Sequence, residues 1–259
     1  PTPWHNQNDT PVKSSYFGIV DTAGIPKNDY YLYQSQWLYV NQHPMVHILP
    51  HWNWEIHKSY QQVVDKYRDI PVRVYSNAGS VELFLNGKSQ GRKTFQEKWT
   101  SDGRKYQEGE GFDQLYLEWR LAYQPGELRA VAYDHQGQIV AEDTAVTAGK
   151  PAKIGLHAEK TKLEPDGQDI LYLYFDVLDK DGNWVPTASN QLHFKIEGPA
   201  RIVGVDNGMQ ASRERYQAQK NGRFKRKAFH GRGVLLVQSL EQAGLVRVKA
   251  SARGLEPAS

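Results

Sequence analysis

The sequence predicts a mainly β protein with two sandwich domains in tandem, preceded by one helix. From residue 46 onward, short segments alternate apolar and polar residues, as expected for strands whose side chains point to opposite faces in turn. Turn residues such as Asn86-Gly87 and Asp181-Gly182 separate these segments. Six or seven short strands within about 100 residues are typical of an immunoglobulin-like sandwich, and the pattern occurs twice.

The composition is that of a folded protein. The 259 residues are 39% hydrophobic and 12% aromatic, which is enough for packed cores. The absence of Cys excludes disulfides and thiolate metal sites, and no apolar run reaches the roughly 20 residues that span a bilayer. The chain begins at Pro1 without a signal peptide, so we expect an internal piece of a longer polypeptide.

The N-terminal part contains the one helical signal. Residues 1–27 are irregular, and Asn28 is a suitable N-cap for a helix. Tyr30, Tyr33 and Trp37 then recur at helical spacing, which predicts an aromatic packing face. A helix of about three turns is not stable alone, so it must pack on a missing neighbour or on the following strands.

Each predicted sandwich has six strands. A polar stretch at 98–111 predicts a long loop in the first sandwich, and Gly149-Lys150-Pro151 predicts a linker between the two. In the second, Leu171, Leu173, Phe175 and Val177 are expected to share one face. The predicted strands are 46–49, 72–76, 81–85, 115–123, 127–133 and 139–147, then 153–158, 170–178, 192–197, 201–205, 233–239 and 245–252.

Charge is distributed unevenly along the chain. Residues 1–151 carry 15 basic against 17 acidic side chains, a net of −2, and residues 152–259 carry 17 against 12, a net of +5. Much of the excess lies at 213–232, where it could meet phosphate or acidic polysaccharide. A solvated pair of strands or a loop explains such a run better, and we expect no nucleic-acid partner.

The segment 46–55, VHILPHWNWE, carries the most prominent aromatic pair. His51, Trp52 and Trp54 can stack on a sugar or form a domain interface, and their position after a connector favours the interface. Trp99 and Trp184 are further aromatic platforms if the chain binds sugars.

Specific segments resemble a known family. PTPWHN, SSYFGIVDTAGIPKNDYYLYQSQW, HILPHWNW and VELFLNGKSQG look like the C-terminal part of family 2 glycoside hydrolases, closest to β-galactosidase-like members of gut Bacteroidetes. The resemblance continues through LEPDGQDILYLYFDVLDKDGNWVP and GVDNG. It implies that residues 1–43 are the last loop and helix of a truncated (α/β)8 barrel, that 44–150 and 151–259 are the sandwiches, and that the parent is periplasmic or extracellular.

The resemblance also bears on catalysis. Retaining glycosidases need two carboxyl groups about 5–5.5 Å apart, and the family's acid/base Glu directly follows an Asn. This sequence has no Asn-Glu dipeptide, so we assign no catalytic residue and expect the chain to be inactive alone. Surface positions are expected for the carboxylates Glu55, Glu82, Glu108, Glu110 and Glu118.

The resemblance places Trp4, His5 and Asn6 in a barrel loop that lines the sugar pocket of the parent. An indole can stack on a pyranose while His or Asn binds its hydroxyl groups. Trp4 could equally anchor the loop against the barrel wall. These three residues are therefore candidate substrate-binding residues of the parent.

No metal or cofactor site is expected. His5, His43, His47, His51 and His57 lack a carboxylate or Cys at ligand spacing. The acidic turn at 179–182 lacks the later Glu of a calcium loop, so it is interpreted as a hairpin turn.

Two functions remain open. The chain is a non-catalytic accessory region whose partners are the upstream barrel of the same polypeptide and the parent's carbohydrate substrate, or it is a carbohydrate-binding module that stacks sugars on exposed Trp residues. The natural glycoside, its linkage and the oligomeric state are not encoded in a recognisable pattern.

Overall fold

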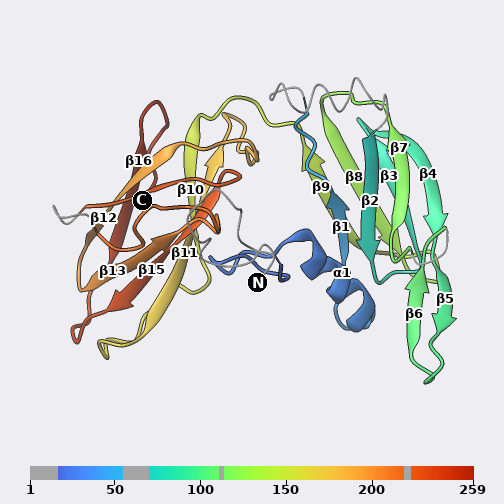
Figure 1. The fold of residues 1–259 in the computed structure, drawn as a ribbon, viewed down its shortest axis with the longest axis horizontal. Helices are drawn as coiled ribbons and strands as arrows, with labels where there is room; N and C mark the ends of the chain where they lie inside the picture. Colours follow the sequence, from blue (N-terminus) through green and yellow to red (C-terminus); the bar gives the residue numbers. More distant parts are fainter. Residues whose placement is uncertain (1–16, 55–69, 111–113, 219–222) are drawn as a thin grey trace, which may run out of the picture. The chain divides into compact units, whose positions relative to one another are not determined.

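The computed structural model describes residues 17–54, 70–110, 114–218 and 223–259. It confirms the mainly β fold with several sheets (Figure 1). The described residues separate into two compact units, one within Pro26–Thr147 and one in which Ala148–Ser259 is joined by residues 17–25. Each unit is a β-sandwich with its own hydrophobic core.

The first unit contains helix α1 and two antiparallel sheets. One sheet has the order β1-β2-β7 and the other the order β4-β3-β8-β9, while β5 and β6 form a separate two-stranded hairpin. The bounds are α1 (Asn28–Trp37), β1 (Val46–Leu49), β2 (Ile70–Ser76), β3 (Ser80–Leu85), β4 (Lys88–Thr94), β5 (Gln96–Trp99), β6 (Lys105–Glu108), β7 (Leu117–Leu121), β8 (Glu127–Tyr133) and β9 (Ile139–Val146).

The alternating pattern of β3 explains how the two sheets meet. Val81, Leu83 and Leu85 are buried, whereas Glu82 and Phe84 between them are partly exposed. The same alternation on β2 and β7 supplies the facing side of the core. The two sheets therefore enclose one core, whose largest fully buried members include Trp52, Leu83, Leu117, Leu128, Val72 and Val74.

Helix α1 packs against β1 rather than standing alone (Figure 1). Tyr31 stacks on His47 of β1 with ring centroids 3.7 Å apart. The Asn28 Oδ1 accepts a hydrogen bond from His47 Nε2 at 3.2 Å, and Lys27 takes the N-cap position without a side-chain cap. The prediction of Asn28 as the N-cap is therefore wrong by one residue, because a tertiary partner engages its amide.

The aromatic stripe predicted on α1 does not face the sheet. Tyr33 and Trp37 are 41% and 70% exposed, and their rings lie 4.6 Å apart on the outer side of the helix. Ser35 is the buried residue of the helix. Helical spacing identifies residues that share a face, but it does not say which face meets the sheet.

The second unit is a sandwich of a four-stranded and a three-stranded antiparallel sheet. Their strand orders are β10-β11-β15-β13 and β14-β12-β16. The predicted inner face of β11 is confirmed, since Leu173, Phe175 and Val177 are buried and Leu171 packs partly buried against the same core. The bounds are β10 (Lys153–Ala158), β11 (Ile170–Leu178), β12 (Gln191–Glu197), β13 (Ala200–Asp206), β14 (Phe224–Lys227), β15 (Arg232–Ser239) and β16 (Arg247–Ala252).

Four strands were not predicted: β4, β5, β6 and β14. β4 (KSQGRKT) and β14 (FKRK) are rich in charged residues and lie at sheet edges, where only one side of the backbone ladder is paired. The loop predicted at 98–111 instead includes β6 and the end of β5. Pairing with a neighbour forms these strands without an apolar alternation of their own.

Candidate functional site

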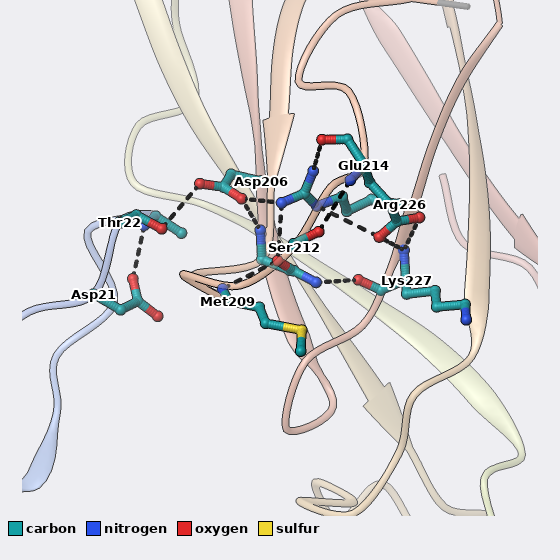
Figure 2. A network of polar contacts seen from close by, with 10 residues as sticks. Asp21, Thr22, Asp206, Met209, Ser212, Glu214, Arg226 and Lys227 are labelled. Atoms are coloured by element: carbon teal, nitrogen blue, oxygen red, sulfur yellow. Dashed lines mark hydrogen bonds and ion pairs between the residues drawn. The ribbon is translucent and has the colours of Figure 1, made fainter. Parts of the chain in front are cut away.

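A fully buried arginine on β14 organises a polar network in the second unit (Figure 2). Arg226 is 0% exposed, and its Nη2 donates to Oδ1 of Asp206 and to Oδ1 of Asn207 at 3.0 Å. Its Nη1 donates to the backbone carbonyl of Glu214 at 3.0 Å, and the ring of Tyr216 lies 5.2 Å from the guanidinium carbon. A buried charge is stable only when paired in this way.

Asp206, at the end of β13, links the network to the N-terminal segment. Its Oδ1 also accepts the backbone N–H of Asn207 at 2.7 Å, and its Oδ2 accepts the hydroxyl of Thr22 at 3.2 Å. Thr22 and Asp206 are 184 residues apart in the sequence. One carboxylate thus joins the buried guanidinium to the residues that precede α1.

Asp21 shapes the segment that Thr22 belongs to. Its Oδ1 accepts the backbone N–H groups of Ala23 at 2.8 Å and Ile25 at 2.9 Å, so the carboxylate holds a local turn. Gly208 lies directly against it, because a Cβ added at Gly208 would be 1.9 Å from Asp21 Oδ2. Gly208 also has φ +74°, so both the space and the backbone conformation favour glycine there.

The network is suited to attachment. The carboxylate of Asp206 accepts hydrogen bonds from a guanidinium, a backbone N–H and a hydroxyl, so both of its oxygens are engaged. Glu214 turns its carboxylate towards the Lys227 backbone N–H at 3.3 Å and lies 3.9 Å from Arg226 Nε. The arrangement therefore fixes three chain segments to one buried charge: the residues before α1, the end of β13 and β14.

A second polar pair lies in the first unit, between β1 and β9. His47 Nδ1 is 3.6 Å from Asp143 Oδ2, which also accepts the Ile48 backbone N–H at 2.8 Å. Burial lowers the pKa of His47 to about 4, which outweighs the attraction of the carboxylate for an imidazolium. Burial likewise raises the pKa of Asp143, against the two backbone donors that lower it.

Of the predicted site residues, the structure describes His51, Trp52 and Trp54. Trp4, His5 and Asn6 lie outside the described residues, so their role in the parent stays a prediction. Trp52 is 0% exposed, and its Nε1 donates to the Gln124 carbonyl at 2.9 Å. Because Trp52 lies within the core of the first sandwich, neither face of its indole is open to a sugar.

His51 and Trp54 lie beside Trp52 and are partly buried. Their ring centroids are 5.7 Å apart, and Trp54 packs against the core of the first sandwich. The interface or sugar-stacking role predicted for them stays a prediction. Trp52 itself is a core residue of the first sandwich.

The two remaining tryptophans differ in accessibility. Trp99 on β5 is 62% exposed. Trp184 donates its Nε1–H to the His230 carbonyl at 2.9 Å, and the Arg232 guanidinium lies 3.9 Å from its ring centroid. One face of Trp184 is therefore already covered, whereas Trp99 remains open.

The basic run at 213–232 is only partly available to a polyanion. Arg226 is buried, and the Arg232 Nε is 3.0 Å from Asp176. β14 and the first residue of β15 lie within this run, so part of its positive charge is on strands of the second sandwich and not on a solvated loop.

The carboxylates that were expected at the surface have partners of their own. Glu118 pairs with Arg73 at 3.0 Å, and Glu110 with Lys93 at 2.6 Å. Glu108 lies 3.9 Å from Lys98, and Glu82 accepts the Ser89 hydroxyl at 2.6 Å. Glu55 lies outside the described residues. Within the described part of the chain, no three His, Cys, Asp or Glu side chains are grouped to hold a metal ion.

The turn at 179–182 is a hairpin turn held by its own carboxylate. Asp179 Oδ1 accepts the backbone N–H groups of Asp181 at 2.9 Å and Asn183 at 2.8 Å, and Oδ2 accepts that of Gly149 at 2.8 Å. Burial opposes ionisation, but these donors outweigh it and lower the pKa of Asp179. The carboxylate thus also anchors the linker.

Sequence reasoning missed Asp206 and Arg226 as a functional pair. The GVDNG segment, which contains Asp206, counted towards the family resemblance, and Arg226 was one of many cations in the basic run. The usable signal was an Arg among the alternating residues of FKRKAF, at a position that a strand would turn inward.

No helix among the described residues has the length and apolar character needed to cross a membrane.

Comparisons with known sequences agree with this architecture. Residues 154–259 match the family described as glycoside hydrolase family 2 C-terminal domain 5, and residues 68–141 match a domain of unknown function, DUF4982. The chain is 38% identical over 248 residues to the β-galactosidase BoGH2A of Bacteroides ovatus, covering 96% of the chain and 25% of that protein. A putative β-glucuronidase of Formosa agariphila is 34% identical over 191 residues, or 74% of the chain and 16% of that protein.

Solved structures of two bacterial glycosidases are also similar to this chain. A β-glycosidase from Bacteroides vulgatus is similar with a TM-score of 0.78 and 32% identity, over 95% of this chain and 28% of that one. A glycosyl hydrolase family 2 member from Bacteroides cellulosilyticus is similar with a TM-score of 0.71 and 30% identity, over 94% of this chain and 31% of that one. The chain thus spans about a quarter of the length of the relatives that match nearly all of it.

Proposed function

Because this chain belongs to glycoside hydrolase family 2, as part of its C-terminal region, we propose that it is a non-catalytic accessory region that supports the catalytic barrel of a parent enzyme. The hydrogen bond from Thr22 to Asp206 carries the proposal. It fixes the residues before α1 to the second sandwich, while α1 itself packs on β1 of the first. The stretch that leads towards the barrel is therefore attached at two points.

An exposed aromatic face on and after α1 supports the same proposal. Tyr33, Trp37 and Tyr39 are 41%, 70% and 74% exposed, and Tyr33 and Trp37 contact each other. Adjacent exposed aromatic side chains are characteristic of surfaces that pack against a partner. We assign this face to the barrel of the parent, with residues 1–43 as the end of that barrel.

The relatives support a retaining β-galactosidase as the parent, acting on β-galactosides of plant or host glycans. BoGH2A, at 38% identity, is named a β-galactosidase, whereas the relatives from Formosa agariphila are named β-glucuronidases or putative ones at 28–34%. The 259-residue chain is expected to release no product from an aryl β-galactoside or an aryl β-glucuronide. Turnover that elutes with the chain on a sizing column would show that it is itself an enzyme.

A chimera tests the supporting role. The C-terminal quarter of BoGH2A is replaced by this chain, with and without Thr22→Val. We expect an active chimera whose activity is lost at a lower temperature in the Thr22→Val form, because Asp206 loses a donor that holds the segment. Thr100→Val, which changes a hydroxyl on the β5–β6 hairpin, is the matched control. Equal thermal inactivation of the two variants contradicts the supporting role.

The exposure of Trp99 favours a second candidate, a carbohydrate-binding module. Its indole is 62% exposed on β5, a geometry in which a pyranose can stack. Affinity electrophoresis on galactan, arabinogalactan and mucin glycans distinguishes the two functions. Retardation that Trp99→Ala abolishes supports the binding module, and unretarded migration on all three removes it.

A further inference from the structure

A cleft of about 440 Å³ opens between the edges of the two sheets of the first sandwich. β4 is the edge strand of one sheet and β7 is the edge strand of the other. Sugar and cofactor sites commonly occupy about 300–1,000 Å³, so the cleft has room for a small saccharide. Its lining residues are Leu85, Asn86, Lys88, Gln90, Arg120, Leu121, Ala122 and Gln124.

The cleft is held open by fixed contacts on both sides. Trp119 of β7 donates its Nε1–H to the Gly91 carbonyl of β4 at 3.2 Å, which ties the two edges together next to the lining residues Gln90 and Arg120. The register of β3 and β4 shifts between Glu82 and Phe84, so the backbone bulges near Gln90. Bulges re-aim side chains, and this one lies where Gln90 lines the cleft.

The turn between β3 and β4 is equally well fixed. Asn86 has φ +51°, and its side-chain oxygen accepts the Glu127 backbone N–H at 2.8 Å. Its amide nitrogen donates to the Pro125 carbonyl at 3.1 Å, which links the turn to the β7–β8 connection. Gly126 also fits only as glycine, because its φ is +136° and a Cβ would be 1.8 Å from the Asn86 side chain. Both walls of the cleft are therefore formed before any ligand arrives.

The cleft carries positive charge. The Lys88 ammonium forms no ion pair with any carboxylate of the described residues. Arg120 is 64% exposed and contacts Glu118 at 3.1 Å through one nitrogen, but Glu118 is shared with Arg73. Two guanidinium groups thus share one carboxylate, so the cleft keeps a net positive charge that an anion can use.

We propose that this cleft binds a carboxylated sugar unit of an acidic oligosaccharide. Lys88 and Arg120 bind the carboxylate, since hydrogen bonds to charged groups are the strong ones. The amides of Gln90 and Gln124 bind hydroxyl groups, and Leu85 and Leu121 form an apolar floor beneath the ring. The inference does not depend on the supporting role, because every residue that carries it lies in the first sandwich.

Titration with a galacturonic acid trimer tests the proposal, followed by backbone NMR on the 259-residue chain. We expect saturable binding at millimolar concentration, with chemical-shift changes concentrated on β4 and β7. The methyl-esterified trimer has the same sugar skeleton without charge and is expected to bind at least about tenfold more weakly, because a charge-assisted hydrogen bond is lost. Inorganic sulfate identifies an anion site without sugar preference if it competes as strongly as the trimer.

The variant pair makes the test specific. Lys88→Gln with Arg120→Gln is expected to weaken trimer binding at least about tenfold. Lys98→Gln with Arg104→Gln removes two exposed charges from the β5–β6 hairpin and is expected to leave binding unchanged. All four side chains are partly or largely exposed, so circular dichroism should show folded variants.

Any of four results would overturn the proposal. These are no saturable binding of the trimer, equal binding of the acid and its methyl ester, competition by sulfate as strong as by the trimer, or equal binding by the two double variants. Charged side chains on edge strands also prevent edge-to-edge pairing. If Lys88→Gln with Arg120→Gln aggregates while retaining full affinity for the trimer, the two cations protect the sheet edge and do not bind sugar.

Discussion

The first sandwich buries a neutral tryptophan beside its sheets, whereas the second buries the guanidinium of an arginine. Trp52 and Arg226 are both 0% exposed, and they are the two largest fully buried side chains described. Trp52 needs one hydrogen bond, from Nε1 to the Gln124 carbonyl. Arg226 needs Asp206, Asn207 and the Glu214 carbonyl together.

The difference separates packing from attachment. Apolar burial contributes in proportion to area and requires no particular partner. A buried charge requires each of its partners, so it fixes the positions of the segments that supply them. In the second sandwich this requirement extends to Thr22, whereas Trp52 is held by residues of its own sandwich. The charged network is therefore the part of this molecule suited to joining distant segments.

Trp52→Ala should give the largest loss of stability. Truncating a buried aromatic residue costs about 3–5 kcal/mol, and the Gln124 carbonyl left without its donor adds about 1 kcal/mol. Hydrogen exchange during denaturant titration should show this loss in the first sandwich and not in the second. Trp37→Ala, at a 70% exposed position, should change stability by about 0.5 kcal/mol or less, and equal effects of the two substitutions would contradict the role of Trp52.

Arg226→Met should destabilise the second sandwich by about 3–5 kcal/mol, because it leaves Asp206 buried without its cation. Adding Asp206→Leu should restore part of that loss, since the unpaired charge is then removed. Hydrogen exchange should rise at residues 17–25 as well as on β13 and β14. Arg201→Met, on the exposed side of β13, is the control, and unchanged exchange at 17–25 in Arg226→Met would separate the network from attachment.

Acidification should weaken the first sandwich by a smaller amount. The pKa of His47 is about 4 when folded and 6.5 in the unfolded chain, so the unfolded chain binds a proton that the folded chain does not. Stability is therefore full above pH 6.5 and decreases as the pH falls towards 4, by about 3 kcal/mol at most. The raised pKa of Asp143 acts in the opposite direction at the acidic end.

Stability measured against pH checks this expectation. His47→Gln keeps a donor for Asn28 but has no imidazole to titrate, so the pH dependence in this window should flatten. Tyr31 of α1 stacks on His47, and burial raises the pKa of its cross-strand neighbour Tyr75 further above this pH window. An unchanged pH profile in His47→Gln would assign the effect to another group.

Strands in which apolar and polar residues alternate could be predicted with their bounds. β1, β8, β10 and β11 have the predicted bounds, because a period of two and flanking turn residues are local properties of the chain. β4 and β14 could not be predicted, since KSQGRKT and FKRK become strands through pairing with β3 and β12. The helix was predicted with its length, but the side that meets the sheet was not.

The candidate sites show the same division. The sequence indicated Trp52 and Trp54 as candidates for an interface or for sugar stacking, but only the packing shows that Trp52 lies inside one sandwich. The cleft between β4 and β7 combines residues from two sheets, so no sequence spacing indicates it. Sequence patterns relate residues that are close along the chain, whereas the cleft is lined by residues from strands of two different sheets.

By itself, the sequence determined the mainly β class, the tandem plan and the resemblance to family 2 glycoside hydrolases, because short motifs and local periodicity carry that information. Only the tertiary structure decided that Thr22 meets Asp206 across 184 residues and that the same Asp206 pairs with the buried Arg226. Such contacts depend on how sheets fold back on one another. The attraction between the guanidinium and the carboxylate strengthens only after the packed strands exclude water, which also makes an unpaired member of the network costly.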